Sequence, residues 1–291
     1  MEMLTDYVDF ADICYTTTQC VNPCFTNCRR TCLLCLDKQN YQSQQRTYDC
    51  EKRCGAYVCH YLFRFFNEMS FLYREVKPLN CSVNVLSLGC GPCSELFSLV
   101  KVLENEYEDY SINFMGIDLS DKWKLFHDEI DRLLTAHQKP INTGFVIGDV
   151  HIVLDHLNEV EFDILVLNYF LSDFLKIHNG SLVEVRYLSQ LIYDKIISRM
   201  RIGSFVLIND INHYNIRDCF DVLTSEIKRY KVVKKYRFDK PAKILERYTP
   251  SYNNRGNKII PIPKKYLSQD FQQAYNPRTD CSSAQVVIEV R

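Results

Sequence analysis

The pattern of apolar and polar positions changes character near residue 80. Before that point, residues 61–76 carry apolar side chains every three or four positions, as in Leu62, Phe65, Phe66 and Met69. That spacing places the side chains on one face, so we expect an amphipathic helix. Beyond residue 80, short apolar runs alternate with longer segments of helical periodicity.

This alternation predicts a sheet whose strands are joined by helices. The apolar runs that we interpret as strands are residues 84–88, 112–117, 145–147, 162–167, 204–208, 232–238 and 285–290. Helical periodicity occurs at residues 93–103, 121–136, 152–157, 182–200 and 217–229. Strands that alternate with helices form a mostly parallel sheet with helices on both faces. We therefore expect an α/β fold with a seven-stranded sheet.

Two segments do not fit this alternation. Residues 1–60 are polar and rich in cysteine, and we expect a small helical module there, followed by the main domain at residues 61–291. Residues 239–283 contain prolines, Gly256 and the pair Asn253-Asn254. That composition is typical of a long loop inserted before the last strand.

Composition and charge narrow the class of protein. The chain is 46% hydrophobic and 24% charged, which is ordinary for a globular protein. It contains no run of eighteen apolar residues and begins without the apolar segment of a signal peptide. We therefore expect no membrane partner and an intracellular, cytoplasmic location.

A basic stretch lies between Lys228 and Lys265. It holds thirteen Lys or Arg residues against Asp239 and Glu246, interleaved with aromatic residues such as Tyr236. Cations mixed with aromatic rings bind phosphates and stack on bases, so a nucleic-acid partner is one interpretation. The other is a solvated edge strand, where lysines discourage edge-to-edge pairing.

A glycine turn, Gly89-Cys90-Gly91-Pro92, follows the first expected strand. Glycines let the backbone approach a ligand closely, and the helix that follows offers its N–H groups and positive dipole end. The third glycine of the dinucleotide motif is replaced by Ser94. The turn therefore favours a smaller zwitterionic group over a pyrophosphate.

The run at residues 85–95 resembles motif I of the Rossmann-like (class I) S-adenosylmethionine-dependent methyltransferases. The later strands match that family in order, because Asp118, Asp149 and Asn168 each follow an apolar run. The resemblance implies that Asp118 holds the ribose hydroxyls and Asp149 the adenine amino group. The implied cofactor-binding residues are Gly89, Cys90, Gly91, Pro92, Asp118, Leu119, Asp149, Val150 and Asn168.

Several of these residues also have structural interpretations. Asp118 and Asp149 could each cap the helix that follows, although Ser120 could serve in place of Asp118. Cys90 and Cys93 could bind a metal, but small buried packing residues are the interpretation that we favour.

The end of the fourth strand should face the substrate. Many nucleic-acid amino-methylating enzymes have an Asx-Pro-Pro-aromatic motif there, but this chain has Asn168-Tyr169-Phe170-Leu171. Tyr169 and Asp173 are the substrate-side candidates, Asp173 either as a general base or as a helix cap. Asn209, Asp210 and His213 could also reach the site or be plain loop residues. Methyl transfer depends mainly on placement, so no catalytic residue is assigned.

Nine of the fourteen cysteines lie between Cys14 and Cys59. Spacings of four place thiolates on one helix face, and two such pairs can complete a tetrahedral zinc site. The expected zinc ligands are Cys20, Cys24, Cys28, Cys32, Cys35, Cys50, Cys54 and Cys59. Twin Cys-x3-Cys helical hairpins with disulfides, and an iron–sulfur cluster, are the alternatives.

These observations predict an S-adenosylmethionine-dependent methyltransferase with a zinc-binding N-terminal module. The acceptor is unidentified, and RNA or another nucleic acid is one candidate. A small-molecule or protein methyltransferase remains an alternative, as does a non-catalytic scaffold of the same fold.

Overall fold

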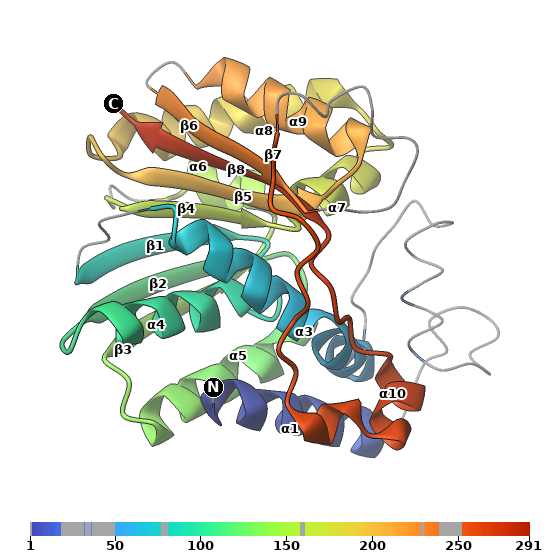
Figure 1. Ribbon diagram of the computed structural model, residues 1–291. Coiled ribbons are helices and arrows are strands. Elements are labelled where there is room, and N and C mark those ends of the chain that lie inside the picture. Colours follow the sequence, from blue (N-terminus) through green and yellow to red (C-terminus); the bar gives the residue numbers. More distant parts are fainter. Residues whose placement is uncertain are drawn as a thin grey trace.

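The computed structural model describes residues 2–18, 32, 36, 50–76, 81–157, 161–227, 230–238 and 252–291. A twisted sheet lies at its centre, with helices on both faces (Figure 1). Helices α1, α3, α4 and α5 cover one face, and α6, α7, α8 and α9 cover the other (Figure 1). The predicted α/β architecture is therefore observed.

The sheet has eight strands in the order β3-β2-β1-β4-β5-β8-β6-β7. Strands β1 to β5 are mutually parallel where they pair, whereas β8 is antiparallel to both β5 and β6. The strand bounds are β1 Ser82–Leu88, β2 Ser111–Asp118, β3 Ile141–Ile147, β4 Ile164–Asn168, β5 Phe205–Ile211, β6 Tyr230–Arg237, β7 Asn253–Asn254 and β8 Ser283–Val290.

The prediction of seven strands was wrong by one, because β7 was not recognised. This strand has only two residues, which pair with Tyr236 and Arg237 of β6. A two-residue strand has no detectable alternation, and β7 lies inside the segment predicted to be a loop.

The helices are α1 Glu2–Thr17, α3 Glu51–Tyr73, α4 Ser94–Glu106, α5 Lys124–Ala136, α6 Val150–Asp155, α7 Phe170–Ile177, α8 Leu182–Lys195, α9 Tyr214–Glu226 and α10 Gln269–Tyr275. Short 3-10 turns are η1 Asp121–Trp123, η2 Ile197–Arg199 and η4 Lys264–Leu267. Helix α1 lies within the segment expected to be a helical module, although its bounds were not predicted, whereas α7 and α10 were not predicted. Both α7 and α10 are too short to establish a helical period.

The central strands are buried on both faces, which explains their continuous apolar runs. In β1, Val85 belongs to the core under α3 and α4, whereas Leu86 and Leu88 belong to the core under α8 and α9. Successive strand residues point to opposite faces, so one run supplies both cores.

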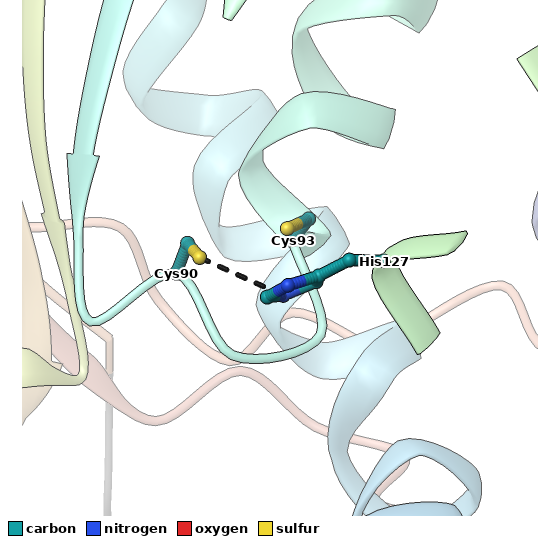
Figure 2. Close-up of side chains that lie close together, drawn as sticks. All are labelled: Cys90, Cys93 and His127. Carbon is teal, nitrogen blue, oxygen red and sulfur yellow. Dashed lines mark hydrogen bonds between the residues drawn. The ribbon is translucent and has the colours of Figure 1, made fainter. Parts of the chain in front are cut away.

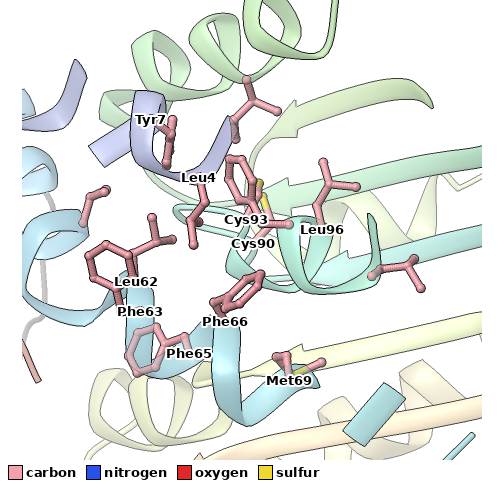
Figure 3. Close-up of a cluster of buried hydrophobic side chains, with 14 of the residues drawn as sticks. Leu4, Tyr7, Leu62, Phe63, Phe65, Phe66, Met69, Cys90, Cys93 and Leu96 are labelled. Carbon is pink, nitrogen blue, oxygen red and sulfur yellow. The ribbon is translucent and has the colours of Figure 1, made fainter. Parts of the chain in front are cut away.

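The first core extends to the start of the chain. Helix α1 contributes Tyr7, Val8 and Ala11, none of them exposed, and packs along α3 (Figure 3). The two helices approach closely at Gly55, where an added Cβ would lie 2.7 Å from the Ala11 carbonyl oxygen. The boundary predicted between residues 60 and 61 falls inside α3. In the described part of residues 1–60, the chain therefore shares the main core.

The segment after β7 folds back across α3 toward α1 (Figure 1). Its described residues include η4 and α10, so the prediction of a plain loop was wrong for this part. The Tyr266 hydroxyl donates to the Thr5 carbonyl at 2.8 Å, and Tyr275 bonds to Asp12. Buried tyrosines that bond to a distant helix hold this segment in place.

Candidate functional site

A cavity lies at the carboxyl ends of β1, β2, β3 and β4. It includes the position where the strand order reverses between β1 and β4, which is where ligands bind in open α/β sheets. The space between its walls, open mouth included, is about 1180 Å³. Every residue predicted to hold the cofactor or face the substrate lines this cavity: Gly89, Cys90, Gly91, Pro92, Asp118, Leu119, Asp149, Val150, Asn168, Tyr169 and Asp173.

The glycine turn forms one wall of this cavity. Gly89 and Gly91 have φ of +66° and +42°, values that favour glycine. The Gly89 and Cys90 N–H groups donate to the Ile117 carbonyl at 2.8 and 3.1 Å, which ties the turn to the end of β2. A Cβ at Gly89 would lie 2.7 Å from Phe170 Cδ2. The turn therefore requires glycine at position 89 for both conformation and space.

Gly89→Ala should weaken binding of the predicted cofactor about tenfold, because the left-handed conformation costs about 1–2 kcal/mol and Phe170 must move. Gly144→Ala is a matched control, since a Cβ at that strand position meets nothing within 4 Å. Calorimetric titration of both variants with S-adenosylmethionine measures the difference. Equal affinities in the two variants would contradict this interpretation of the turn.

Asp118 connects the glycine turn to the loop after β2. Its Oδ2 accepts the Gly91 N–H at 2.8 Å, and its Oδ1 accepts the Ser120 N–H at 3.0 Å. Each carboxylate oxygen can accept a second hydrogen bond. Burial raises the pKa of Asp118 to about 6. Ser120, not Asp118, caps the following turn, because its hydroxyl accepts the Lys122 N–H.

Asp149 has the capping role that the sequence left open. Its Oδ1 accepts the His151 N–H at 2.8 Å, so it is the N-cap of α6. The same residue lines the cavity. Capping uses one carboxylate oxygen, and a role toward adenine remains a prediction.

Charge is distributed unevenly in this cavity. Three aspartates line it, Asp118, Asp149 and Asp173, and no Lys or Arg does so among the described residues. Like charges within a cavity of low dielectric repel strongly. The lining therefore favours a cationic ligand group and disfavours a pyrophosphate.

A buried polar network that was not predicted from the sequence lies behind the glycine turn. Asn168 donates to the Ser94 hydroxyl at 2.9 Å and to Glu95 Oε2 at 3.3 Å. Burial raises the pKa of Glu95 to about 7. The Asn209 side-chain amide donates to Asn168 Oδ1 at 2.9 Å. Polar residues inside apolar strands, such as Asn168 and Asn209, were the available signal.

Tyr169 is the N-cap of α7 and has the left-handed conformation, with φ of +55°. Its hydroxyl donates to Glu68 Oε2 at 2.9 Å, and its ring lies 4.0 Å from the Phe65 ring between centroids. Strained backbone of this kind persists where the surroundings fix it, often at functional sites. The structure therefore places Tyr169 firmly on the wall of the cavity.

The remaining polar candidates, Asp173, Asp210 and His213, lie in different parts of the structure. Asp173 lies in the first turn of α7 and not at its N-cap. Asp210 is fully buried and accepts the Ser172 N–H at 2.9 Å, so it holds the start of α7. His213 lies outside this cavity and lines a second one. Asp173 is thus the carboxylate of this group that reaches the cavity.

The predicted zinc ligands are only partly described. Cys20, Cys24, Cys28 and Cys35 lie outside the described residues. Cys32, Cys54 and Cys59 are buried in the hydrophobic core, and Cys50 is the N-cap of α3. The described members form no group with metal-ligand spacing. Zinc in this segment stays a prediction.

A Cys90–Cys93–His127 group lies behind the glycine turn (Figure 2). Within the described ranges, it is the group whose ligand atoms lie close enough to hold a metal. His127 Nε2 lies 2.9 Å from the Gly91 carbonyl oxygen, to which it can donate, and 3.7 Å from Cys90 Sγ. Burial raises the pKa of both thiols and lowers that of His127 to about 4. At pH 7 the group is therefore neutral, which fits a packing role behind the turn.

The basic stretch is described in part. Lys234 and Arg255 both pair with Glu75, Lys235 pairs with Asp221, and Lys265 pairs with Asp9. These described cations therefore compensate acids of the same chain. A nucleic-acid interface here stays a prediction.

No helix in the described part of the chain is both long and apolar enough to span a bilayer.

Comparison with known proteins bears on the fold. No family model matches the chain, and no curated protein is significantly similar in sequence. A methyltransferase from Pyrococcus furiosus covers 76% of this chain and 82% of its own, with 10% identity and a TM-score of 0.42. A precorrin-6y C5,15-methyltransferase from Geobacter metallireducens covers 76% and 87%, with 9% identity and a TM-score of 0.42. A spermidine synthase in complex with a transition-state analogue covers 78% and 59%, with 11% identity and a TM-score of 0.42. At these identities the likeness concerns the fold alone, so function has to be argued from the site.

Proposed function

We propose that this chain is an S-adenosylmethionine-dependent methyltransferase. The observation that carries the proposal is the charge of the cavity beside the glycine turn. Three aspartates and no Lys or Arg line it among the described residues. S-adenosylmethionine carries a sulfonium cation, which this lining attracts, whereas a dinucleotide brings a pyrophosphate, which it repels.

The remaining geometry supports the same ligand. The Asp118 carboxylate lines the cavity and accepts the Gly91 and Ser120 N–H groups, and its acceptor-only oxygens suit a pair of ribose hydroxyls. The N-terminus of α4 follows the turn and suits the carboxylate of the methionyl group. Asn168 and Tyr169 lie at the end of β4, where the methyl group would face the acceptor.

The chemistry asks little of the side chains. The S–CH3 bond breaks with its electron pair returning to sulfur, and a lone pair of the acceptor forms the new bond to carbon. The sulfonium charge disappears in this step, so the aspartates would serve binding, while placement would supply most of the rate.

Calorimetric titration of the full chain tests the proposal. S-adenosylmethionine and S-adenosylhomocysteine should bind with dissociation constants of about 1–100 μM, within the usual range of enzyme substrates. NAD+ should not bind measurably. Binding of NAD+ without binding of S-adenosylmethionine would overturn the assignment. Tight binding with no turnover across acceptor panels would favour the non-catalytic scaffold.

A further inference from the structure

A second cavity lies on the far side of Tyr169 from the proposed cofactor site. Tyr57, Phe65 and Tyr169 line both cavities and form their common wall. The second cavity extends from the end of β5 and the start of α9 along α7 as far as Lys176, with about 1450 Å³ between its walls, open mouth included. It therefore lies where an acceptor would approach a methyl group held at the end of β4.

Aromatic rings cover one side of this second cavity. Tyr61 and Phe65 are stacked, with centroids 5.3 Å apart and planes 2° apart. The ring centroids of Phe65 and Tyr169 are 4.0 Å apart, and those of Tyr57 and Tyr61 are 4.9 Å apart. Successive ring faces and edges of this kind accommodate another planar ring.

The charge of the second cavity is opposite to that of the first. Arg64, Lys176 and Arg278 line it, and no Asp or Glu does so within the described part of the chain. Arg64 is compensated from behind by Asp280 and Glu68. Arg278 instead donates to His60 Nε2 at 3.1 Å, and burial lowers the His60 pKa to about 4. Arg278 is therefore held by a partner that is neutral at pH 7 and keeps its charge for a ligand.

We infer that the second cavity is the acceptor site and takes a planar aromatic ring that carries an anionic group, either a phosphate or a carboxylate. The ring lies against Tyr61 and Phe65, and the anion binds Arg278 and Lys176. This inference rests on the proposed function, because it requires a methyl donor in the first cavity. An acceptor O–H or N–H would lose its proton to water as the methyl group arrives.

Two matched pairs of probes test the inference on the full chain saturated with S-adenosylhomocysteine. One pair is uridine 5′-monophosphate and uridine, and the other is 4-hydroxybenzoate and 4-hydroxybenzamide. In at least one pair, the anion should bind at least about tenfold more tightly than its neutral partner. The pair that shows the difference tells whether the cavity binds a phosphate or a carboxylate.

The variants locate the binding. Arg278→Gln should weaken binding of the anion about tenfold. Lys176→Gln should weaken it too, and this variant serves as the test if Arg278→Gln does not fold. Tyr61→Leu should weaken both members of the pair. Lys124→Gln is the control, because this exposed cation on α5 pairs with Asp128. S-adenosylhomocysteine affinity should stay unchanged in all four variants.

Three results would overturn the inference: equal affinity within both pairs, undiminished binding of the anion in both Arg278→Gln and Lys176→Gln, or probes that bind the unliganded chain but not the chain saturated with S-adenosylhomocysteine. Titration of S-adenosylhomocysteine alone is carried out first. Its failure would remove the proposed function, and the probe series on the unliganded chain would still show whether the cavity selects planar anions.

Discussion

Asp118→Asn should weaken the binding of S-adenosylmethionine about 10- to 100-fold, the largest effect on affinity expected from a single side chain. The aspartate accepts N–H groups from Gly91 and Ser120, and each carboxylate oxygen has more than one accepting position. Asparagine places an N–H2 group at one of these positions and removes the charge. Hydrogen bonds to a charged group contribute about 1.5–3 kcal/mol, and losing that free energy weakens binding by about 10- to 100-fold.

The same residue should make binding depend on pH. Burial raises the Asp118 pKa to about 6, so the unliganded carboxyl is protonated below that value. A protonated carboxyl cannot accept both ribose hydroxyls, and wild-type affinity should therefore fall by up to about tenfold per pH unit below pH 6. Stability should move in the opposite direction. The folded pKa lies above the ordinary aspartate pKa of 3.8, so protonation of Asp118 favours the folded state as pH falls from about 6 toward 4.

Calorimetric titrations between pH 5 and pH 8 measure how the affinity of the wild type and of Asp118→Asn depends on pH. The affinity of Asp118→Asn should not change with pH where that of the wild type falls, because the titrating carboxyl is missing. Asp149 and Asp173 are retained in both proteins. Asp121→Asn, at an exposed position, controls for a general change in charge. A wild-type slope that persists in Asp118→Asn would assign the titration to another group.

Glu68→Ala should destabilise the fold by about 3–5 kcal/mol, the largest stability effect that we expect. Glu68 has no exposed surface, and its carboxylate accepts hydrogen bonds from the Tyr169 hydroxyl, the Asn209 amide and the N–H groups of Ser282 and Ser283. Alanine removes the acceptor of the Tyr169 hydroxyl and of the Ser282 and Ser283 N–H groups, and Asn209 keeps only its bond to Asn168. Each buried donor that loses its acceptor carries a desolvation penalty.

Urea unfolding of matched variants measures the effect. Glu68→Gln should fall between wild type and alanine, because its amide oxygen accepts some of these bonds while its N–H2 group faces donors. Glu108→Ala, at an exposed position, should change the free energy of unfolding by less than about 0.5 kcal/mol. A loss in Glu68→Ala no larger than that of Glu108→Ala would show that the network does not stabilise the fold.

Much of the central fold followed from short-range patterns. Continuous apolar runs identified seven of the strands, because a strand covered on both faces has no polar side. The glycine turn could also be predicted from the sequence, as could Asp118, Asp149 and Asn168 at or just after the ends of β2, β3 and β4. The carboxyl ends of neighbouring parallel strands meet at one edge, so residues such as Gly89, Asp118 and Asp149 line one cavity.

Other features depend on segments that are distant in sequence. Helix α1 is stable through its packing on α3 and α5, and its own pattern was not recognised within the cysteine-rich segment. The segment with η4 and α10 was read as a loop because its contacts are made with α1 and α3.

The sequence by itself determined the order of the strands and helices, the glycine turn and the acids that follow the strands, because each depends on neighbours within a few residues. Only the tertiary structure decided that Glu68 of α3 meets Asn209, Tyr169 and Ser282, and that Arg278 donates to His60. Those contacts join positions more than a hundred residues apart, and their free energy comes from burying polar groups together. No local pattern of side chains can encode that pairing.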